Sequence, residues 1–348
     1  MTNDRMPIKD RRVPSSIFLF IVFSFSFSIG CQHIEKAVGR EDVIVTVSEE
    51  GEWKRLESLL RGIFEREEPY SLERRPFFEL RQVSPGDFDL YQFRKNLLLV
   101  GVFGSNPLIQ ELLTEEAKGE VLSKKALLFE MRDPWVEGQS LLIATGVDGD
   151  TLSSLLKNYG EYLFNFYKEE VSRRTVKRIY ADGYEEEMAL RFKGYYGWTL
   201  RLPEGYRIAL EDSLGRFVQM IRNSPDRLIT LYWEGWEGGP DQVFSLLKEC
   251  IDLRDTLAER YFGGDVVLRD RVQKEEVPFQ GRKALRVVGH WENEKKVMGG
   301  PFVSYCFIQE GRFYFLDLHL FAPGEKKWLY LLQLEEIAKT FEAGGVLP

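Results

Sequence analysis

Near its C-terminal end, the chain carries a cysteine, an aspartate, a histidine and a serine whose spacing would place them on one face of a β-hairpin. Residues 302–309 and 313–321 are strand-like, and they flank Glu310-Gly311, a pair suited to a two-residue hairpin loop. The pairs that such a loop predicts are Ile308 with Phe313, Cys306 with Phe315, Ser304 with Asp317, and Phe302 with His319. Because alternate residues of a strand share a face, Cys306, Asp317 and His319 are the candidate catalytic residues.

Two interpretations of this face stay open. Thiolate and imidazole groups act as nucleophiles and as transition-metal ligands, so the face would suit an envelope hydrolase or a metal-dependent enzyme. Alternation along the preceding strand, in a register not yet known, would add Arg286, His290 and Glu292. The other interpretation is a half-covered sheet face with ordinary polar residues and Cys306 as a small core side chain. The close ligand spacing of short metal motifs is missing, so we predict no metal and no cofactor.

Three further motifs could bind a ligand. Trp233 and Trp236 precede a glycine-rich acidic loop and could form an aromatic platform for a sugar or a peptide, or they could be core residues. The run 299–301 (Gly-Gly-Pro) could bring backbone amides close to a ligand, but we interpret it as a turn into a strand. The acidic run 185–187 could attract a hard cation, but we interpret it as a solvated linker.

The N-terminal residues predict the cellular location of the protein. Four basic residues within 5–12 precede an apolar run, 17–29, that is shorter than the 20 or so residues of a spanning helix, and Gly30-Cys31 follows it. This order is typical of a lipoprotein signal peptide that is cleaved before Cys31. We therefore predict lipid on Cys31, membrane attachment through that lipid, and a location in the cell envelope, on the outer membrane facing the periplasm or the cell surface. An uncleaved anchor or an ordinary signal peptide is the alternative.

Charge and cysteine content limit the possible partners. The formal net charge is −8, with acidic and basic residues interspersed, which argues against nucleic acid as a partner. Beyond Cys31 only Cys250 and Cys306 remain, and their distance in the sequence leaves open whether they form a disulfide.

The remaining sequence predicts an α+β fold of two domains. Residues 1–30 are the signal peptide, 31–41 a tether, 42–180 the N-terminal domain and 188–348 the C-terminal domain. Each domain is expected to be an antiparallel or mixed sheet with packed helices. The expected strands are 43–47, 77–83, 96–103, 126–131, 140–145, 190–202, 216–222, 227–233, 284–292, 302–309 and 313–321, and the expected helices are 52–65, 151–176, 241–262 and one that follows Pro323-Gly324.

Several stretches resemble a family of uncharacterised lipoproteins known mainly from Bacteroidetes, which carry a domain of unknown function. The stretches are 298–305 (MGGPFVSY), 321–327 (FAPGEKK), 93–99 (FRKNLLL) and 202–206 (LPEGY). The resemblance implies a lipoprotein of the same architecture and brings no catalytic residues. The order of elements in the second domain is also similar to PsbP-like folds, which are mostly non-enzymatic.

These observations favour a non-catalytic lipoprotein that binds an envelope protein or a glycan. The alternatives are the hydrolase or metal-dependent enzyme at Cys306, Asp317 and His319, and a structural spacer.

Overall fold

The computed structural model describes residues 36–239 and 247–344, and these form two compact units. Unit 1 runs to Arg66 and continues with Pro76–Glu170, whereas unit 2 consists of Glu67–Arg75 and the chain from Val171 onward. The division therefore falls after residue 170, upstream of the boundary between 180 and 188 expected from the sequence, and a short early segment belongs to the later unit. The predicted signal peptide, Cys31 and residues 32–35 of the tether lie outside the described residues.

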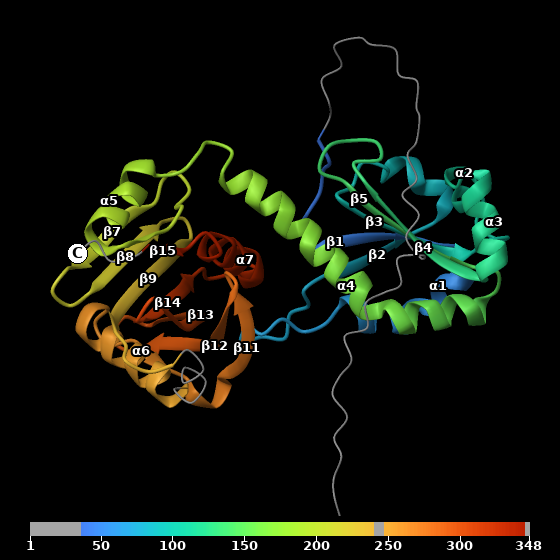
Figure 1. Cartoon of the computed structure of the whole chain (residues 1–348). Coiled ribbons are helices and arrows are strands. Elements are labelled where there is room, and N and C mark those ends of the chain that lie inside the picture. Colours follow the sequence, from blue (N-terminus) through green and yellow to red (C-terminus); the bar gives the residue numbers. More distant parts are fainter. Residues whose placement is uncertain (1–35, 240–246, 345–348) are drawn as a thin grey trace, which may run out of the picture. The chain divides into compact units, whose positions relative to one another are not determined.

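The elements of unit 1 are interspersed strands and helices (Figure 1). Their bounds are β1 Val43–Val47, α1 Glu50–Phe64, β2 Glu79–Val83, β3 Asn96–Val102, α2 Pro107–Leu112, α3 Glu115–Lys124, β4 Ala126–Arg132, β5 Ser140–Gly146 and α4 Gly149–Ile179, of which the part up to Glu170 belongs to unit 1.

Unit 1 is built on a mixed five-stranded sheet in the order β2-β1-β3-β5-β4. All neighbours are parallel except β4, which runs antiparallel to β5 at one edge. The strands β3 and β5 are buried along almost their whole length, as expected for apolar strands covered on both faces. The helices α2 and α3 cover one face through Ile109, Ala117 and Val121.

Unit 2 contains a larger sheet that is antiparallel throughout. The helices and strands of unit 2 have the bounds α5 Glu186–Tyr196, β6 Trp198–Thr199, β7 Arg207–Asp212, β8 Phe217–Arg222, β9 Asp226–Gly235, α6 Leu247–Tyr261, β10 Val266–Val267, β11 Gln273–Phe279, β12 Arg282–Asn293, β13 Met298–Gln309, β14 Arg312–Phe321, α7 Lys327–Ala338 and β15 Glu342–Ala343. Eight strands form the sheet in the order β10-β12-β13-β14-β9-β8-β7, with β11 also paired to β12.

Both faces of this sheet are covered (Figure 1). The helix α6 packs on one face through Cys250, Ile251 and Leu257, which join an apolar cluster with Cys306 and Phe315. The opposite face lies under α7, where buried aromatic rings of β13 and β14 stack against each other and against Phe341. The sequence-based expectation of one half-covered face is therefore wrong, because α6 closes it.

The α+β, two-domain expectation is confirmed, and so are most of the expected elements. The expected strand 190–202 is wrong, because its first part is the helix α5. Ala189 and Phe192 are buried at helical spacing, and Gly197 ends the helix with φ at +76°, a conformation that favours glycine. Only Trp198–Thr199 pairs as a strand. Within the described residues, no helix is both long and apolar enough to cross a membrane.

Candidate functional site

The predicted pairing of the β13–β14 hairpin is confirmed. Phe302 lies opposite His319, Ser304 opposite Asp317, Cys306 opposite Phe315, and Ile308 opposite Phe313. The two-residue loop at Glu310-Gly311 sets this register because both of its residues have positive φ angles, as this loop type requires.

Asp317 is the centre of a buried polar network on this face. Its Oδ1 accepts hydrogen bonds from Ser304 Oγ at 2.6 Å and from Arg254 Nε of α6 at 3.2 Å, and its Oδ2 lies 3.2 Å from His319 Nδ1. Burial alone would raise the pKa of Asp317, but Arg254, His319 and Ser304 lower it to about 2. The Arg254 guanidinium also lies 4.1 Å from the ring centre of Phe302. The network therefore fixes an ionised carboxylate deep in unit 2.

Cys306 does not join this network as a nucleophile. Its side chain is fully buried, and burial together with the hydrogen-bonded Cys250 thiol raises its pKa well above the ordinary value. A reactive cysteine needs a thiolate and access to solvent. Both cysteines are free thiols. In the described part of the chain, His, Cys, Asp and Glu side chains nowhere gather in a group of three or more that could hold a metal ion.

The residues expected from the preceding strand lie on the other face of the sheet. Arg286 lies opposite Tyr305, and His290 lies opposite Pro301, so neither shares the face of Cys306. Glu292 follows the same alternation. The expectation is wrong because a shift of one residue in register moves every side chain of a strand to the opposite face.

The two tryptophans do not form one platform. Trp233 is 6% exposed and packs against Tyr196 and Trp198, with ring centres 4.8 and 5.5 Å away. Trp236 packs beside Phe313 on the α6 face of the sheet. The two rings therefore lie on opposite faces, and Trp233 is part of the core.

The other two sequence motifs have structural positions of their own. Glu185 occupies the N-cap position of α5 without a capping hydrogen bond, and its side chain instead accepts a hydrogen bond of 2.8 Å from the Gly205 amide, so the acidic run begins a helix. Gly299 and Gly300 lie within β13 and not in a turn. A Cβ on Gly300 would overlap the carbonyl oxygen of Leu320, so close approach of neighbouring backbone requires glycine there.

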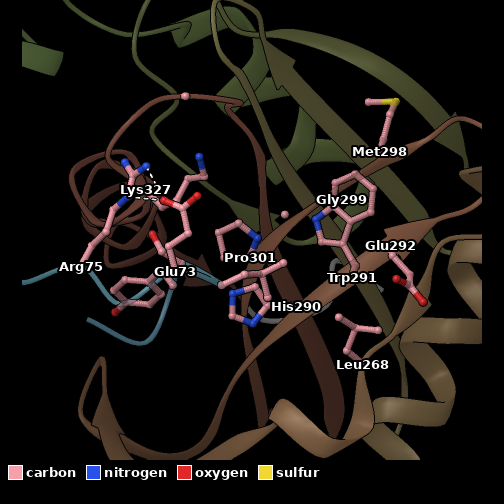
Figure 2. Close-up of a pocket in the computed structure, with 15 residues that line it drawn as sticks. Glu73, Arg75, Leu268, His290, Trp291, Glu292, Met298, Gly299, Pro301 and Lys327 are labelled. Carbon is pink, nitrogen blue, oxygen red and sulfur yellow. Dashed lines mark hydrogen bonds and ion pairs between the residues drawn. The ribbon is translucent and has the colours of Figure 1, made fainter. Parts of the chain in front are cut away.

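The glycine pair lines a cleft of about 460 Å³ in unit 2, which we call the first cleft (Figure 2). Five parts of the chain form it: the segment 70–75, Leu268 after β10, the end of β12, the beginning of β13, and the turn that leads into α7. Figure 2 shows Arg75 and Lys327 at one end, Glu292 and Met298 at the other, and His290 and Trp291 between them. Two of the stretches that carry the family resemblance, 298–305 and 321–327, thus meet at one cavity.

The segment Glu67–Arg75 forms one wall of the first cleft, and sequence reasoning missed it. The Glu68 amide donates to the Arg75 carbonyl at 2.9 Å, and the Glu68 carboxylate accepts a hydrogen bond of 2.6 Å from the Tyr70 amide. Arg286 donates to the Tyr70 hydroxyl at 3.0 Å and so ties the segment to β12. Such a long-range attachment leaves no periodic signal in the sequence.

His290 is the unusual group in this cleft. The side chain is 5% exposed, yet neither ring nitrogen makes a hydrogen bond of normal geometry within the described structure. Burial lowers the pKa of His290, whereas the interaction of the ring with the backbone of Tyr70 raises it by less. The net shift is downward, so the ring is neutral at pH 7. A neutral imidazole offers one donor and one acceptor. A buried polar group without partners is costly, which is typical of a position kept for a ligand or a water molecule.

The charges around the first cleft balance. Arg75 pairs with Glu73 at 2.8 Å, and Lys327 Nζ donates to backbone carbonyls that include Glu325 at 3.0 Å. Burial and the nearby Arg75 lower the pKa of Lys327. With Glu292 as the second acid, two bases and two acids line the cleft, so its chemistry suits a polar ligand of no net charge.

Residues 185–340 match the model of a family described as a domain of unknown function (DUF4837). This stretch lies within unit 2 and is similar to that domain. The resemblance to a domain of unknown function, inferred from the sequence, is thus confirmed. Of the stretches that carry it, three lie inside the match, 202–206, 298–305 and 321–327, and one lies outside it, 93–99. A comparison with curated proteins found no match.

Two solved structures show a distant likeness. One is a crystal structure from Bacteroides thetaiotaomicron, with 9% identity and a TM-score of 0.29, covering 43% of this chain and 46% of that one. The chain thus aligns with less than half of that protein. The other is LpqN, described as involved in cell envelope biogenesis of Mycobacterium tuberculosis, with 14% identity, a TM-score of 0.29, and coverage of 42% and 83%. These scores are too low to carry an argument about fold or function.

Proposed function

We propose that this protein is a lipid-anchored protein of the cell envelope that binds a polar ligand in the first cleft of unit 2. The observation that carries the proposal is His290, a buried imidazole whose ring nitrogens make no hydrogen bond of normal geometry within the described structure, on the wall of a 460 Å³ cavity. Cavities of this size, lined by aromatic groups and a few fixed polar groups, are typical of small-molecule or segment binding.

The chemistry of the described residues supports binding more than catalysis. The candidate nucleophile Cys306 is a buried, protonated thiol, and Asp317 is held ionised by Arg254. The hydroxyl of Ser71, which lines the first cleft, donates to the Glu68 carboxylate, and that carboxylate also accepts from the Tyr70 amide.

The proposed location in the cell envelope is inferred from the sequence. Cys31 follows the apolar run 17–29 and a glycine, so signal-peptide cleavage would leave a cysteine at the N-terminus for acylation. We place the lipid in the outer membrane, with the folded units facing the periplasm or the cell surface. Cells fed an alkyne fatty acid should label the wild-type protein and leave the Cys31→Ala variant unlabelled, and equal labelling of the two would refute lipidation at Cys31.

Binding can be tested by photo-crosslinking from the wall of the first cleft. A photoreactive amino acid at Leu72, which is 62% exposed and lines the cleft, should capture a ligand in cells, whereas one at Leu214, 96% exposed on the β7–β8 turn, should not. Adding His290→Leu to the Leu72 probe should abolish capture. Equal capture from both positions, or capture that survives His290→Leu, would contradict the proposal.

A further inference from the structure

A second cleft, of about 370 Å³, lies in unit 2 where the β8–β9 hairpin, the end of α6 and β14 meet. His319 and Phe262 line it. Trp291 and Met298 line both this cleft and the first one, so the two cavities adjoin each other. A ligand longer than one cleft could therefore extend into the other.

The Asp317 network fixes which hydrogen bond His319 offers to the second cleft. An ionised carboxylate only accepts hydrogen bonds, so the His319 Nδ1 that faces Asp317 Oδ2 at 3.2 Å carries the proton. In a neutral imidazole with this tautomer, the other ring nitrogen, Nε2, is an acceptor. Arg254 pairs with the other carboxylate oxygen of Asp317, Oδ1, at 3.2 Å. The cleft thus receives a fixed acceptor, ready for a ligand hydroxyl or N–H group.

The other groups of the second cleft fit the same kind of ligand. Asp226 and Asp265 add acceptor oxygens, and each is held by a hydrogen bond of 2.7 Å from a neighbouring asparagine side chain. The partly exposed ring of Phe262 lies 5.3 Å from the His319 ring and offers an apolar surface beside the acceptors. Lys296 donates to the Phe262 carbonyl at 2.6 Å, which holds its ammonium group at the rim.

We propose that the second cleft binds a saccharide ring, whose hydroxyl groups donate to His319 Nε2 and the two carboxylates while its apolar face packs on Phe262. A sugar ring combines several donors with C–H faces, and a row of fixed acceptors beside an aromatic ring matches both. This inference rests on the proposed function and names its ligand as a glycan, of which one part occupies the first cleft and the next part the second.

The test uses the full chain in detergent and three neutral tetrasaccharides, chitotetraose, cellotetraose and maltotetraose, with tetra-alanine as the peptide control. Binding is followed by saturation-transfer NMR and calorimetry. His319→Asn keeps a donor toward Asp317 and removes the acceptor, and Phe262→Leu removes the ring. Each should weaken binding of at least one tetrasaccharide tenfold or more. Tyr195→Leu, which changes an aromatic residue that is 79% exposed on α5, should not affect binding. Circular dichroism confirms that each variant folds.

The other outcomes separate this inference from the proposed function. If no tetrasaccharide binds but the Leu72 probe captures a peptide in cells, the saccharide inference is overturned and the proposed function stands. If saccharide binding survives His319→Asn and Phe262→Leu but is lost in His290→Leu, the sugar occupies the first cleft alone, and the second cleft is not a saccharide site. If neither saccharide binding nor capture occurs, both proposals are overturned.

Discussion

Removal of the Asp317 charge should strongly destabilise unit 2. Asp317 and Arg254 are each only 1% exposed, and among the described residues neither Nη atom of Arg254 has a hydrogen-bond partner. Within the described structure, the carboxylate of Asp317 therefore balances the positive charge of the Arg254 guanidinium. When one partner of a buried ion pair is removed, the remaining charge is left uncompensated, at a cost of about 3–5 kcal/mol.

The pKa of Asp317 gives a second measure of the same interaction. A shift from 3.8 to about 2 corresponds to about 2 kcal/mol, at roughly 1.4 kcal/mol for each pH unit. We therefore expect Asp317→Asn, which keeps the shape of the side chain, to lower the free energy of unfolding by about 2–4 kcal/mol at pH 7. Because the pKa of Asp317 is depressed in the folded state, its contribution is present above pH 3.8 and is lost as the pH falls toward 2.

The measurement is urea unfolding followed by tryptophan fluorescence, which reports mainly on unit 2. The tryptophans of unit 2 are Trp198, Trp233, Trp236, Trp291 and Trp328. Arg254→Met completes a double-mutant cycle. Because the double variant buries no charge at this position, it should be more stable than Asp317→Asn alone, with a coupling energy of about 2 kcal/mol.

Two results would refute this reasoning. One is a loss below about 1 kcal/mol in Asp317→Asn, the value typical of a surface ion pair. The other is simple additivity of the two substitutions, since that would mean that Arg254 does not depend on Asp317. A difference between wild type and Asp317→Asn that persists unchanged at pH 3 would contradict the assignment of the pKa.

Three further predictions follow from the same geometry. Gly300→Ala should cost about 3 kcal/mol or more in urea unfolding because its Cβ overlaps a neighbouring carbonyl, whereas Gly235→Ala, with open space around its Cβ, should cost under about 1 kcal/mol; similar losses would contradict the overlap. Ellman's reagent should label Cys250 and Cys306 only after unfolding, and rapid native labelling would refute their burial. His290→Leu should preserve or raise stability, most of all below pH 6.5, where the unfolded wild type takes up a proton that the folded imidazole resists; a Tm that falls by more than about 5 °C would oppose this.

The sequence was informative wherever the determinants were local. Alternation and the Glu310-Gly311 loop gave the correct register of β13 and β14, because a two-residue loop leaves little freedom in pairing. The next strand, β12, is joined to β13 by a less regular connection, so its register could not be derived and the faces of Arg286 and His290 were assigned wrongly. Helix α5 was missed because aromatic residues that favour strands also pack well on a helix that is capped by Gly197.

The candidate site was harder to predict than the fold. Gly299 and Gly300 were noticed, but their role depends on the backbone of β14, which no local pattern reveals. The wall at 67–75 and the pairing of Arg254 with Asp317 join residues that are far apart in the chain. Such contacts depend on tertiary packing alone, so composition and spacing could supply the residue types but not their neighbours.

Because of the early segment Glu67–Arg75, the lining of the first cleft is not one continuous stretch of chain. The family match begins at residue 185, so it includes the floor of the first cleft and leaves out one of its walls. A fragment that begins at residue 185 would present its glycine pair and His290 on an open surface, without Tyr70 above them. During synthesis the wall is made well over a hundred residues before the floor, so the cavity is completed only when the last strands have been added. A gene that acquired the matched region alone would encode the floor of the first cleft without the wall that Glu67–Arg75 forms.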